Sequence, residues 1–140
     1  MRVTALLADS AQVDPAGKVH ALGLGWTSVP TPTVPMAVIV IADLTNDEVL
    51  ATTRRTIHVD LCDPTSEVVK IPSSDGGGRT VQVEVEMGID PSSVDRPGIQ
   101  RMCAVVNLGP GIPLPPGEYR WVVTIDGSDT QAEATFFAID

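Results

Sequence analysis

The sequence predicts an all-β protein, and three observations support this class. Twelve glycines and twelve prolines divide the 140 residues into short segments, which favours strands over helices. Several segments alternate between apolar and polar residues, as a strand does when one face is buried. Helical patterns do not alternate with these strands along the chain. We therefore expect one domain over residues 1–140, an antiparallel β-sandwich of the immunoglobulin-like type with about eight or nine strands, with a jelly roll or a small barrel as alternatives.

The expected sandwich starts with a hairpin around which the other strands assemble. Residues 3–9 and 19–26 are two apolar runs, joined through a turn at residues 14–18 that contains proline and glycine. Gly23 and Gly25 leave room in the second strand for a bend or a close crossing. Trp26 is one of two tryptophans, and we expect it to plug one end of the core.

The next segments combine a stiff connection with a buried strand. Three prolines in residues 30–35 predict an extended link between sheets or along an edge. Residues 36–42 are apolar throughout, which predicts a strand that is buried on both faces or whose outer face meets a partner. Thr45 and Glu48 have the spacing of a capping box, but few apolar residues follow, so we expect a loop or a single turn there.

Two strands in the middle of the chain alternate cleanly. In residues 56–62 and 80–87 we expect one face to be buried and the other to be polar. A short strand at 67–71 and a flexible loop at 73–78 lie between them, and 90–98 form another polar loop. The inward side chains are expected to be Ile57, Val59, Leu61, Val81, Val83, Val85 and Met87.

The C-terminal part predicts a central strand and a final hairpin. Residues 101–108 show little polar alternation, which indicates a central position in a sheet. Residues 118–126 and 131–139 are joined by a turn that starts at Asp126–Gly127. Tyr119 either packs or bonds the backbone through its hydroxyl, as in a tyrosine corner. The inward side chains are expected to be Tyr119, Trp121, Val123, Ile125, Ala132, Ala134, Phe136 and Ala138.

Two stretches resemble a bacterial family known as a domain of unknown function, whose members are small and mostly single-domain. The first comprises Leu6–Asp9, Ala11–Val13, Gly17–Lys18 and Leu22–Trp26. The second comprises Asn107–Gly109 and Leu114–Tyr119. The resemblance implies a compact β domain with no assigned activity, and it supplies no site residues.

The charge of the chain argues against several classes of partner. The net charge is −9, and the densest basic spot is the pair Arg54–Arg55. We therefore expect neither nucleic acid nor an anionic membrane surface as a partner. A cytoplasmic location is expected, since residues 1–9 are too short an apolar stretch for a signal peptide. Cys62 and Cys103 are then expected to be free thiols, with a disulfide only in an exported protein.

Candidate metal ligands are present, but their spacing is unfavourable. His58, Asp60 and Cys62 share one strand face, with consecutive side chains about 7 Å apart, which is too wide for zinc without a bulge. Loop acids could bind calcium in a ligand-binding sandwich, but no EF-hand pattern is present. These candidates are Asn46, Asp47 and Glu48 with Asp60 and Asp63, or Asp126 with Asp129. We expect no metal and no cofactor.

Catalytic and sugar-binding patterns are weak as well. The chain contains only His20 and His58 as histidine bases, and it has no GxSxG signature. Residues 73–78 lack the Lys-Ser/Thr that would complete a phosphate loop. Trp26, Tyr119 and Trp121 could stack on a glycan, but in apolar strands they are expected to serve the core. We therefore expect no catalytic residue.

The leading hypothesis is a non-enzymatic protein-interaction or structural module that associates with itself. Residues 36–42 and the end of the last strand carry more apolar side chains than one buried face needs. Phe137 and Ile139 fall on the face opposite Phe136, so we predict that they form the interface. The rival hypothesis is a β-sandwich that binds calcium or a glycan.

Overall fold

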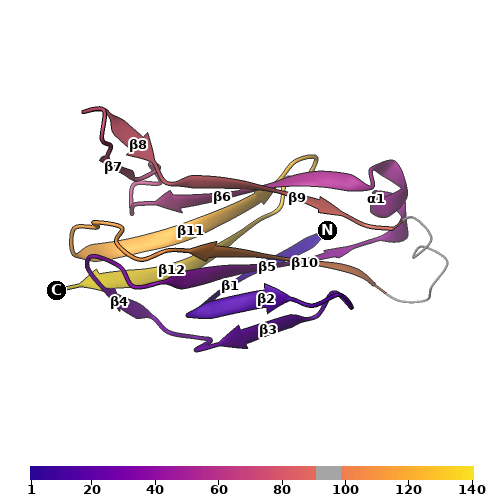
Figure 1. Ribbon diagram of the computed structural model, residues 1–140. Helices are drawn as coiled ribbons and strands as arrows, with labels where there is room; N and C mark the ends of the chain where they lie inside the picture. Colours follow the sequence, from indigo (N-terminus) through magenta and orange to yellow (C-terminus); the bar gives the residue numbers. More distant parts are fainter. Residues whose placement is uncertain (91–98) are drawn as a thin grey trace.

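Two β-sheets surround the hydrophobic core in the computed structural model, which describes residues 1–90 and 99–140 (Figure 1). The smaller sheet has the order β1-β5-β10, with β1 (Arg2–Ala8), β5 (Met36–Leu44) and β10 (Gln100–Leu108). The larger sheet has the order β4-β12-β11-β6-β9, with β4 (Ser28–Pro30), β12 (Gln131–Ile139), β11 (Gly117–Ile125), β6 (Arg54–Cys62) and β9 (Gln82–Gly88). Two hairpins stand beside them: β2 (Ser10–Val13) with β3 (Val19–Leu22), and β7 (Lys70–Pro72) with β8 (Gly78–Thr80).

The all-β class is confirmed, while the strand count and the purely antiparallel pairing are wrong. The described residues form twelve strands instead of eight or nine. The strand expected at 80–87 is divided at Val81 between β8 and β9, and the short strands β2 and β4 were not expected. The short strand β4 pairs with β12 in the parallel direction, so the larger sheet is mixed. The loop expected at 90–98 lies, apart from Asp90, outside the described residues.

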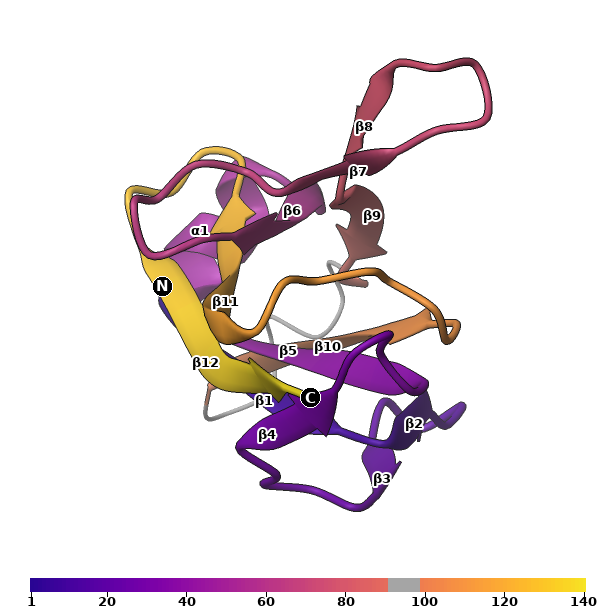
Figure 2. The same ribbon diagram turned by 90° about the vertical axis from the view of Figure 1, so that its left-hand side faces the viewer.

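The core consists of the side chains that the two larger sheets turn toward each other. Figure 2 shows the backbones of these two sheets facing each other. Every side chain expected to point inward from 56–62, 118–126 and 131–139 belongs to this cluster or packs against it. Trp121 and Phe136 are its largest fully buried members. The clean period of two in these strands therefore identified the buried face correctly, because adjacent residues of a strand point to opposite faces.

The predicted first hairpin is wrong. β1 pairs along its whole length with β5, from Arg2 opposite Asp43 to Ala8 opposite Ala37. The true hairpin is β2–β3, closed by Asp14, whose carboxylate accepts hydrogen bonds from the backbone N–H groups of Ala16 and Lys18. The nine apolar-rich residues of β5 offer β1 a longer and better buried partner than the four residues of β3 do.

The hairpin β2–β3 explains why residues 36–42 are apolar throughout. One face of β5 points into the main core, and the other forms a second small cluster of Ala37 and Ile39 with Ala8. Ala11 of β2 and Val19 of β3 pack against that second cluster. The prediction of a strand buried on both faces is confirmed, and its outer face is covered by this chain's own hairpin.

A sharp turn follows the hairpin and places Trp26. Gly23 has a φ of 66°, in the left-handed region that favours glycine, and a Cβ there would lie 2.0 Å from the Asp9 carboxylate, which would have to move. Trp26 lies outside any strand, half-buried, with its ring edge-on to Phe136 at a centroid distance of 5.7 Å. Of the two alternatives at Gly23 and Gly25, the structure shows the bend, while a strand that ends on Trp26 is wrong.

Three local predictions concern the proline-rich link, the capping box and Tyr119. The proline-rich residues 31–35 connect β4 of the larger sheet to β5 of the smaller sheet, as predicted. Thr45 and Glu48 form a complete capping box on α1 (Asn46–Ala51), so the predicted turn is a short helix. The Tyr119 hydroxyl donates a hydrogen bond to the carbonyl of Pro115 at 2.7 Å, which selects the backbone-bonding alternative.

Candidate functional site

The predicted metal-ligand candidates do not assemble. His58 Nε2 lies 2.9 Å from Asp126 Oδ1, and His58 Nδ1 lies 3.4 Å from Glu84 Oε1. Asp60 instead accepts a hydrogen bond from Gln82, and Cys62 is buried. Across residues 1–90 and 99–140, no three His, Cys, Asp or Glu side chains come close enough together to hold a metal ion.

The calcium candidates are dispersed by the fold. Asn46, Asp47 and Glu48 lie in α1. Asp63 is engaged in its own turn, where its carboxylate accepts hydrogen bonds from the N–H groups of Thr65 and Glu67. The Thr65 hydroxyl also donates to this carboxylate. The hydroxyl bond first, and the two N–H bonds after it, lower the pKa of Asp63. Among the described residues these candidate loop acids therefore do not converge on one point.

The aromatic candidates serve the core. Trp121 is 0% exposed and Tyr119 is buried, with its ring 6.0 Å from Phe136 in a stacked arrangement. Only the half-buried Trp26 reaches the surface among these three. A sugar platform built from Trp26, Tyr119 and Trp121 is contradicted, because a stacked sugar needs an exposed ring face.

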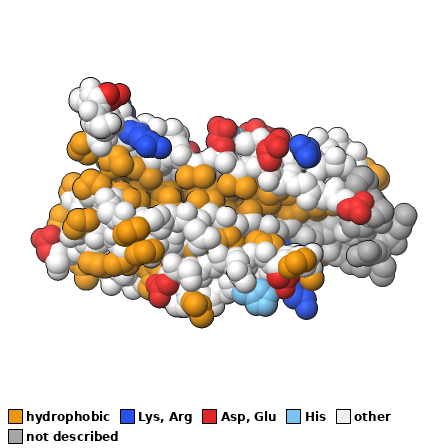
Figure 3. All heavy atoms as spheres, viewed as in Figure 1, with side chains coloured by type: hydrophobic (Ala, Val, Ile, Leu, Met, Phe, Trp, Pro, Cys, Tyr) orange, Lys and Arg blue, Asp and Glu red, His pale blue; other side chains and the backbone are white. Residues whose placement is uncertain are grey.

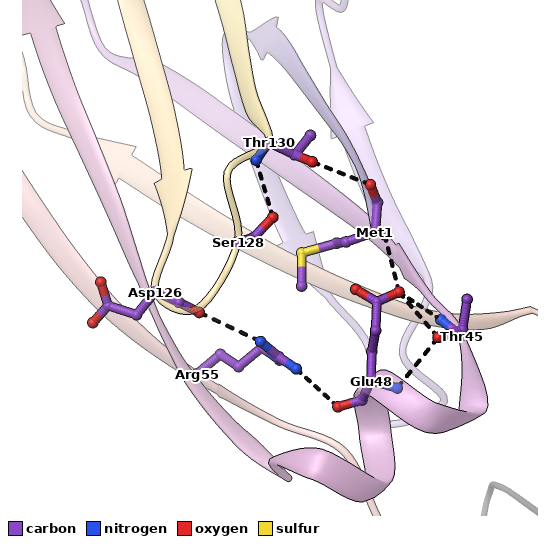
Figure 4. A network of polar contacts seen from close by, with 7 residues as sticks. All are labelled: Met1, Thr45, Glu48, Arg55, Asp126, Ser128 and Thr130. Atoms are coloured by element: carbon purple, nitrogen blue, oxygen red, sulfur yellow. Dashed lines mark hydrogen bonds and ion pairs between the residues drawn. The ribbon is translucent and has the colours of Figure 1, made fainter.

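A polar network joins α1 to the start of the chain and to the turn between β11 and β12 (Figure 4). The Met1 ammonium lies 2.9 Å from Glu48 Oε1, which also accepts from the backbone N–H of Thr45. Arg55 is buried and donates to the carbonyls of Glu48 at 2.8 Å and Asp126 at 3.4 Å. Thr130 donates through its hydroxyl to the carbonyl of Met1 at 3.3 Å. Glu48 and Arg55 are thus already engaged by this chain, and they tie α1 to Met1 and to the turn between β11 and β12.

The network predicts a pH dependence of stability. The Thr45 N–H, and after it the Met1 ammonium, lower the pKa of Glu48 below its ordinary value of 4.5. A carboxyl whose pKa is lower in the folded state stabilises the fold above its unfolded pKa and loses this effect as pH falls through its folded pKa. Glu48→Gln should therefore lower the free energy of unfolding by about 1 kcal/mol near pH 7, and by much less near pH 3. Urea unfolding of both proteins at the two pH values measures this, and an equal difference at both would contradict it.

Both cysteines are free thiols on opposite sides of the core. Cys62 lies on the outer face of the larger sheet and Cys103 on the outer face of the smaller sheet. Burial raises the pKa of both thiols. Because the thiolate is the nucleophile, neither cysteine has the environment of an activated one.

The predicted interface residues Phe137 and Ile139 are exposed at the C-terminal end of β12. Their exposed fractions are 50% and 49%, whereas the adjacent Phe136 is fully buried. The parallel register places Ser28 of β4 beside Phe137 and Pro30 beside Ile139. These four residues, here called the β12 patch, are all exposed and none is charged. The prediction that the outer face of this strand turns from polar to apolar is therefore confirmed.

A second surface lies where the two larger sheets remain open toward solvent. β9 is the last strand of the larger sheet and β10 the last strand of the smaller one, so the expectation that 101–108 would be central is wrong. Figure 3 shows a band of hydrophobic side chains along this side of the molecule. We call it the β9–β10 groove. One end is a hollow of about 670 Å³ lined by Val85–Asp90, Gln100–Val105 and Pro15–Gly17. The other is a hollow of about 310 Å³ whose lining includes Ile71, Val83, Leu108 and Ile112.

The sequence predicted which side chains of β9 face inward, but it did not predict that β9 and β10 lie at the edges of their sheets. Val83, Val85, Ile89 and Leu108 are half-buried although they point toward the core. Period-two alternation identifies the inward face of a strand, but it does not distinguish a central strand from one at an edge. Their partial burial therefore depends on the position of β9 and β10 at the edges of the two sheets.

Comparison with known proteins provides a family and no activity. The model of a family described as a family of unknown function, DUF6941, matches residues 3–136. No curated protein matches the sequence. In the described part of the chain, no helix has the length and apolar character needed to span a bilayer.

Proposed function

The chain belongs to this family of unknown function, and we propose that it is a non-enzymatic protein-interaction module that associates with itself through the β12 patch. The observation that carries the proposal is the pair of half-exposed apolar side chains Phe137 and Ile139. Contiguous exposed apolar residues framed by polar ones are typical of contact surfaces.

Charge selects this surface for contact between copies. Each chain has a net charge of −9, so two copies repel each other over most of their surfaces. The β12 patch carries no charge, and Glu118 lies at its rim, opposite Phe137 on β11. A two-fold axis through the patch would pack it against its own copy, as most homodimers do.

The size of the patch predicts weak association. Burying the exposed halves of Phe137 and Ile139 on two copies contributes roughly 3–6 kcal/mol, at half the usual value for complete burial of each of the four side chains. Association costs about the same or more in lost translational and rotational freedom. We therefore expect a dimer that forms at high protein concentration and dissociates on dilution.

The test is a double substitution in the patch. Phe137→Ser with Ile139→Ser should reduce the mass measured by light scattering at high concentration and raise the dissociation constant at least about tenfold. Circular dichroism should show that the fold is retained, because both side chains are already half exposed.

A matched control uses two other exposed apolar residues. Leu22 and Leu50 are 72% and 64% exposed and lie outside the patch, so Leu22→Ser with Leu50→Ser should leave the mass unchanged. A parent protein that stays monomeric at high concentration, or a control that dissociates equally, would refute the proposal. Unfolding of the patch variant would show that Phe137 and Ile139 serve the fold instead.

We also propose a β-sandwich of the immunoglobulin-like type for the fold and the cytoplasm for the location. Two sheets around one core and the Tyr119 corner support the first. The two free thiols support the second, because disulfides are rare in that compartment. Comparison of an experimental structure with known sandwiches, and fractionation of the cells that make the protein, test these two points.

A further inference from the structure

The outer edge of β9 offers a row of backbone hydrogen-bonding groups. Ile89 N–H donates to the carbonyl of Thr53, and Leu61 N–H donates to that of Val81. Hydrogen-bonded pairs alternate along an antiparallel ladder, so Val83, Val85 and Met87 direct their backbone groups toward β6. The groups of Glu84 and Glu86 then point away from β6. Among the described residues, no strand pairs with this edge.

A strand added to this edge would meet an apolar face and an acidic face. On the inner side, its residues would lie beside the half-buried Val83 and Val85 and would cover the band in Figure 3. On the outer side, its residues would stand next to the side chains of Glu84 and Glu86, which are 71% and 68% exposed. Neighbouring side chains on one face of a sheet interact, so opposite charges there are favourable.

The carboxylates of Glu84 and Glu86 remain accessible to a further positive charge. Glu86 lies 3.5 Å from Arg54 and Glu84 lies 3.4 Å from His58, and both carboxylates still remain largely exposed. On β10, Arg101 is already engaged by Asp43, with Nε–Oδ1 and Nη2–Oδ2 distances of 2.6 and 3.0 Å. The groove therefore attracts positive charge on its β9 side.

A second copy of β9 is a poor occupant of this edge. Two copies paired antiparallel about Val85 would place Glu84 of each opposite Glu86 of the other. Like charges directly opposite each other destabilise a sheet. The edge thus disfavours contact between copies and favours a segment of opposite charge.

We propose that the β9–β10 groove binds an extended segment of a partner protein in which basic and apolar residues alternate. The segment adds a strand to β9, with its basic side chains beside Glu84 and Glu86 and its apolar side chains over Val83 and Val85. The backbone bonds provide affinity, and the alternation provides specificity, as in other cases of strand addition. This site is separate from the β12 patch.

The test uses a defined peptide and backbone NMR of the full chain. An acetylated, amidated peptide of alternating lysine and valine, about nine residues long, spans the seven residues of β9. Titration should shift amide signals of β9 and the facing residues of β10. A peptide of the same composition with lysines and valines in adjacent pairs cannot separate charge from apolar side chains by face, and it should bind more weakly. Methylating alternate backbone nitrogens of the first peptide should abolish binding.

Charge variants complete the test. Glu84→Gln with Glu86→Gln should weaken the binding of the alternating peptide about three- to ten-fold. Glu67→Gln with Glu118→Gln removes the same charge from exposed residues elsewhere and should leave the affinity unchanged. Phe137→Ser with Ile139→Ser should also leave it unchanged, which separates this proposal from that of self-association.

Four results would overturn the proposal. Shifts that map outside β9 and β10, or equal binding of the two peptides, would show nonspecific attraction to an acidic protein. The absence of any shift would show that Glu84 and Glu86 protect the edge, as charged residues on edge strands often do. A doubled mass that the Glu84→Gln and Glu86→Gln changes alter, without peptide, would show that a second copy occupies the edge.

Discussion

Replacing Trp121 with alanine should lower the free energy of unfolding by about 3–5 kcal/mol, the range for emptying a buried aromatic site. Trp121 is 0% exposed at the middle of β11, which itself lies inside the larger sheet between β12 and β6. Among the described residues its Nε1–H has no hydrogen-bond partner, so the substitution breaks no such bond there. Chemical denaturation followed by circular dichroism measures the difference.

Trp26 is the natural comparison for this prediction. It is half-buried and touches the core through the edge of Phe136, so Trp26→Ala should cost clearly less than Trp121→Ala. Equal losses for the two variants would mean that the turn around Trp26 is buried more deeply than the structure shows. A Trp121→Ala protein as stable as the parent would contradict the assignment of Trp121 to the core.

Replacing Ile39 with alanine should cost about 2–5 kcal/mol, although Ile39 points away from the main core. It is 2% exposed on the outer face of β5, in the small cluster that the β2–β3 hairpin covers. The alanine would leave a cavity between the sheet and the hairpin. Denaturation of the purified protein at low concentration measures the effect without contributions from association.

Ile41 provides the matched control on the same face. It is only half-buried at the margin of the same cluster, so Ile41→Ala should cost less than Ile39→Ala. If Ile39→Ala had no effect at low concentration, the hairpin would not cover this face. The other expectation for residues 36–42, that a partner covers their outer face, would then be favoured.

The two tryptophans show how far sequence patterns reach. Trp121 lies in a strand where apolar residues recur at every second position, and its inward direction follows from that period alone. Trp26 follows an apolar run interrupted by two glycines, and the pattern of that run predicts one strand. The left-handed φ values of Gly23 and Gly25 end the strand before Trp26. Glycine permits a turn without requiring one, so this ambiguity was inherent in the sequence.

Hydrogen-bonded motifs formed by residues close together in the sequence could be predicted equally well. The capping box of Thr45 and Glu48 and the turn around Asp14 depend on residues only a few positions apart, and both form. The opposite directions of Phe136 and Phe137 also follow from strand geometry, as the exposed fractions confirm. Phe137 and Ile139 of the β12 patch could thus be predicted, whereas Ser28 and Pro30 join it only through the pairing of β4 with β12.

The amino-acid sequence by itself therefore determined the all-β class, the inward face of the strands that alternate cleanly and the exposed pair Phe137 and Ile139. The tertiary structure alone decided which strands are neighbours: β1 pairs with β5, β2–β3 covers β5, and β9 and β10 end their sheets. The physical reason is that side-chain direction depends on the chain's own period of two, whereas pairing is a competition among all strands for the best-buried partner. The β9–β10 groove is a product of that competition, because it lies where, in residues 1–90 and 99–140, two sheets that share a core end without a further strand.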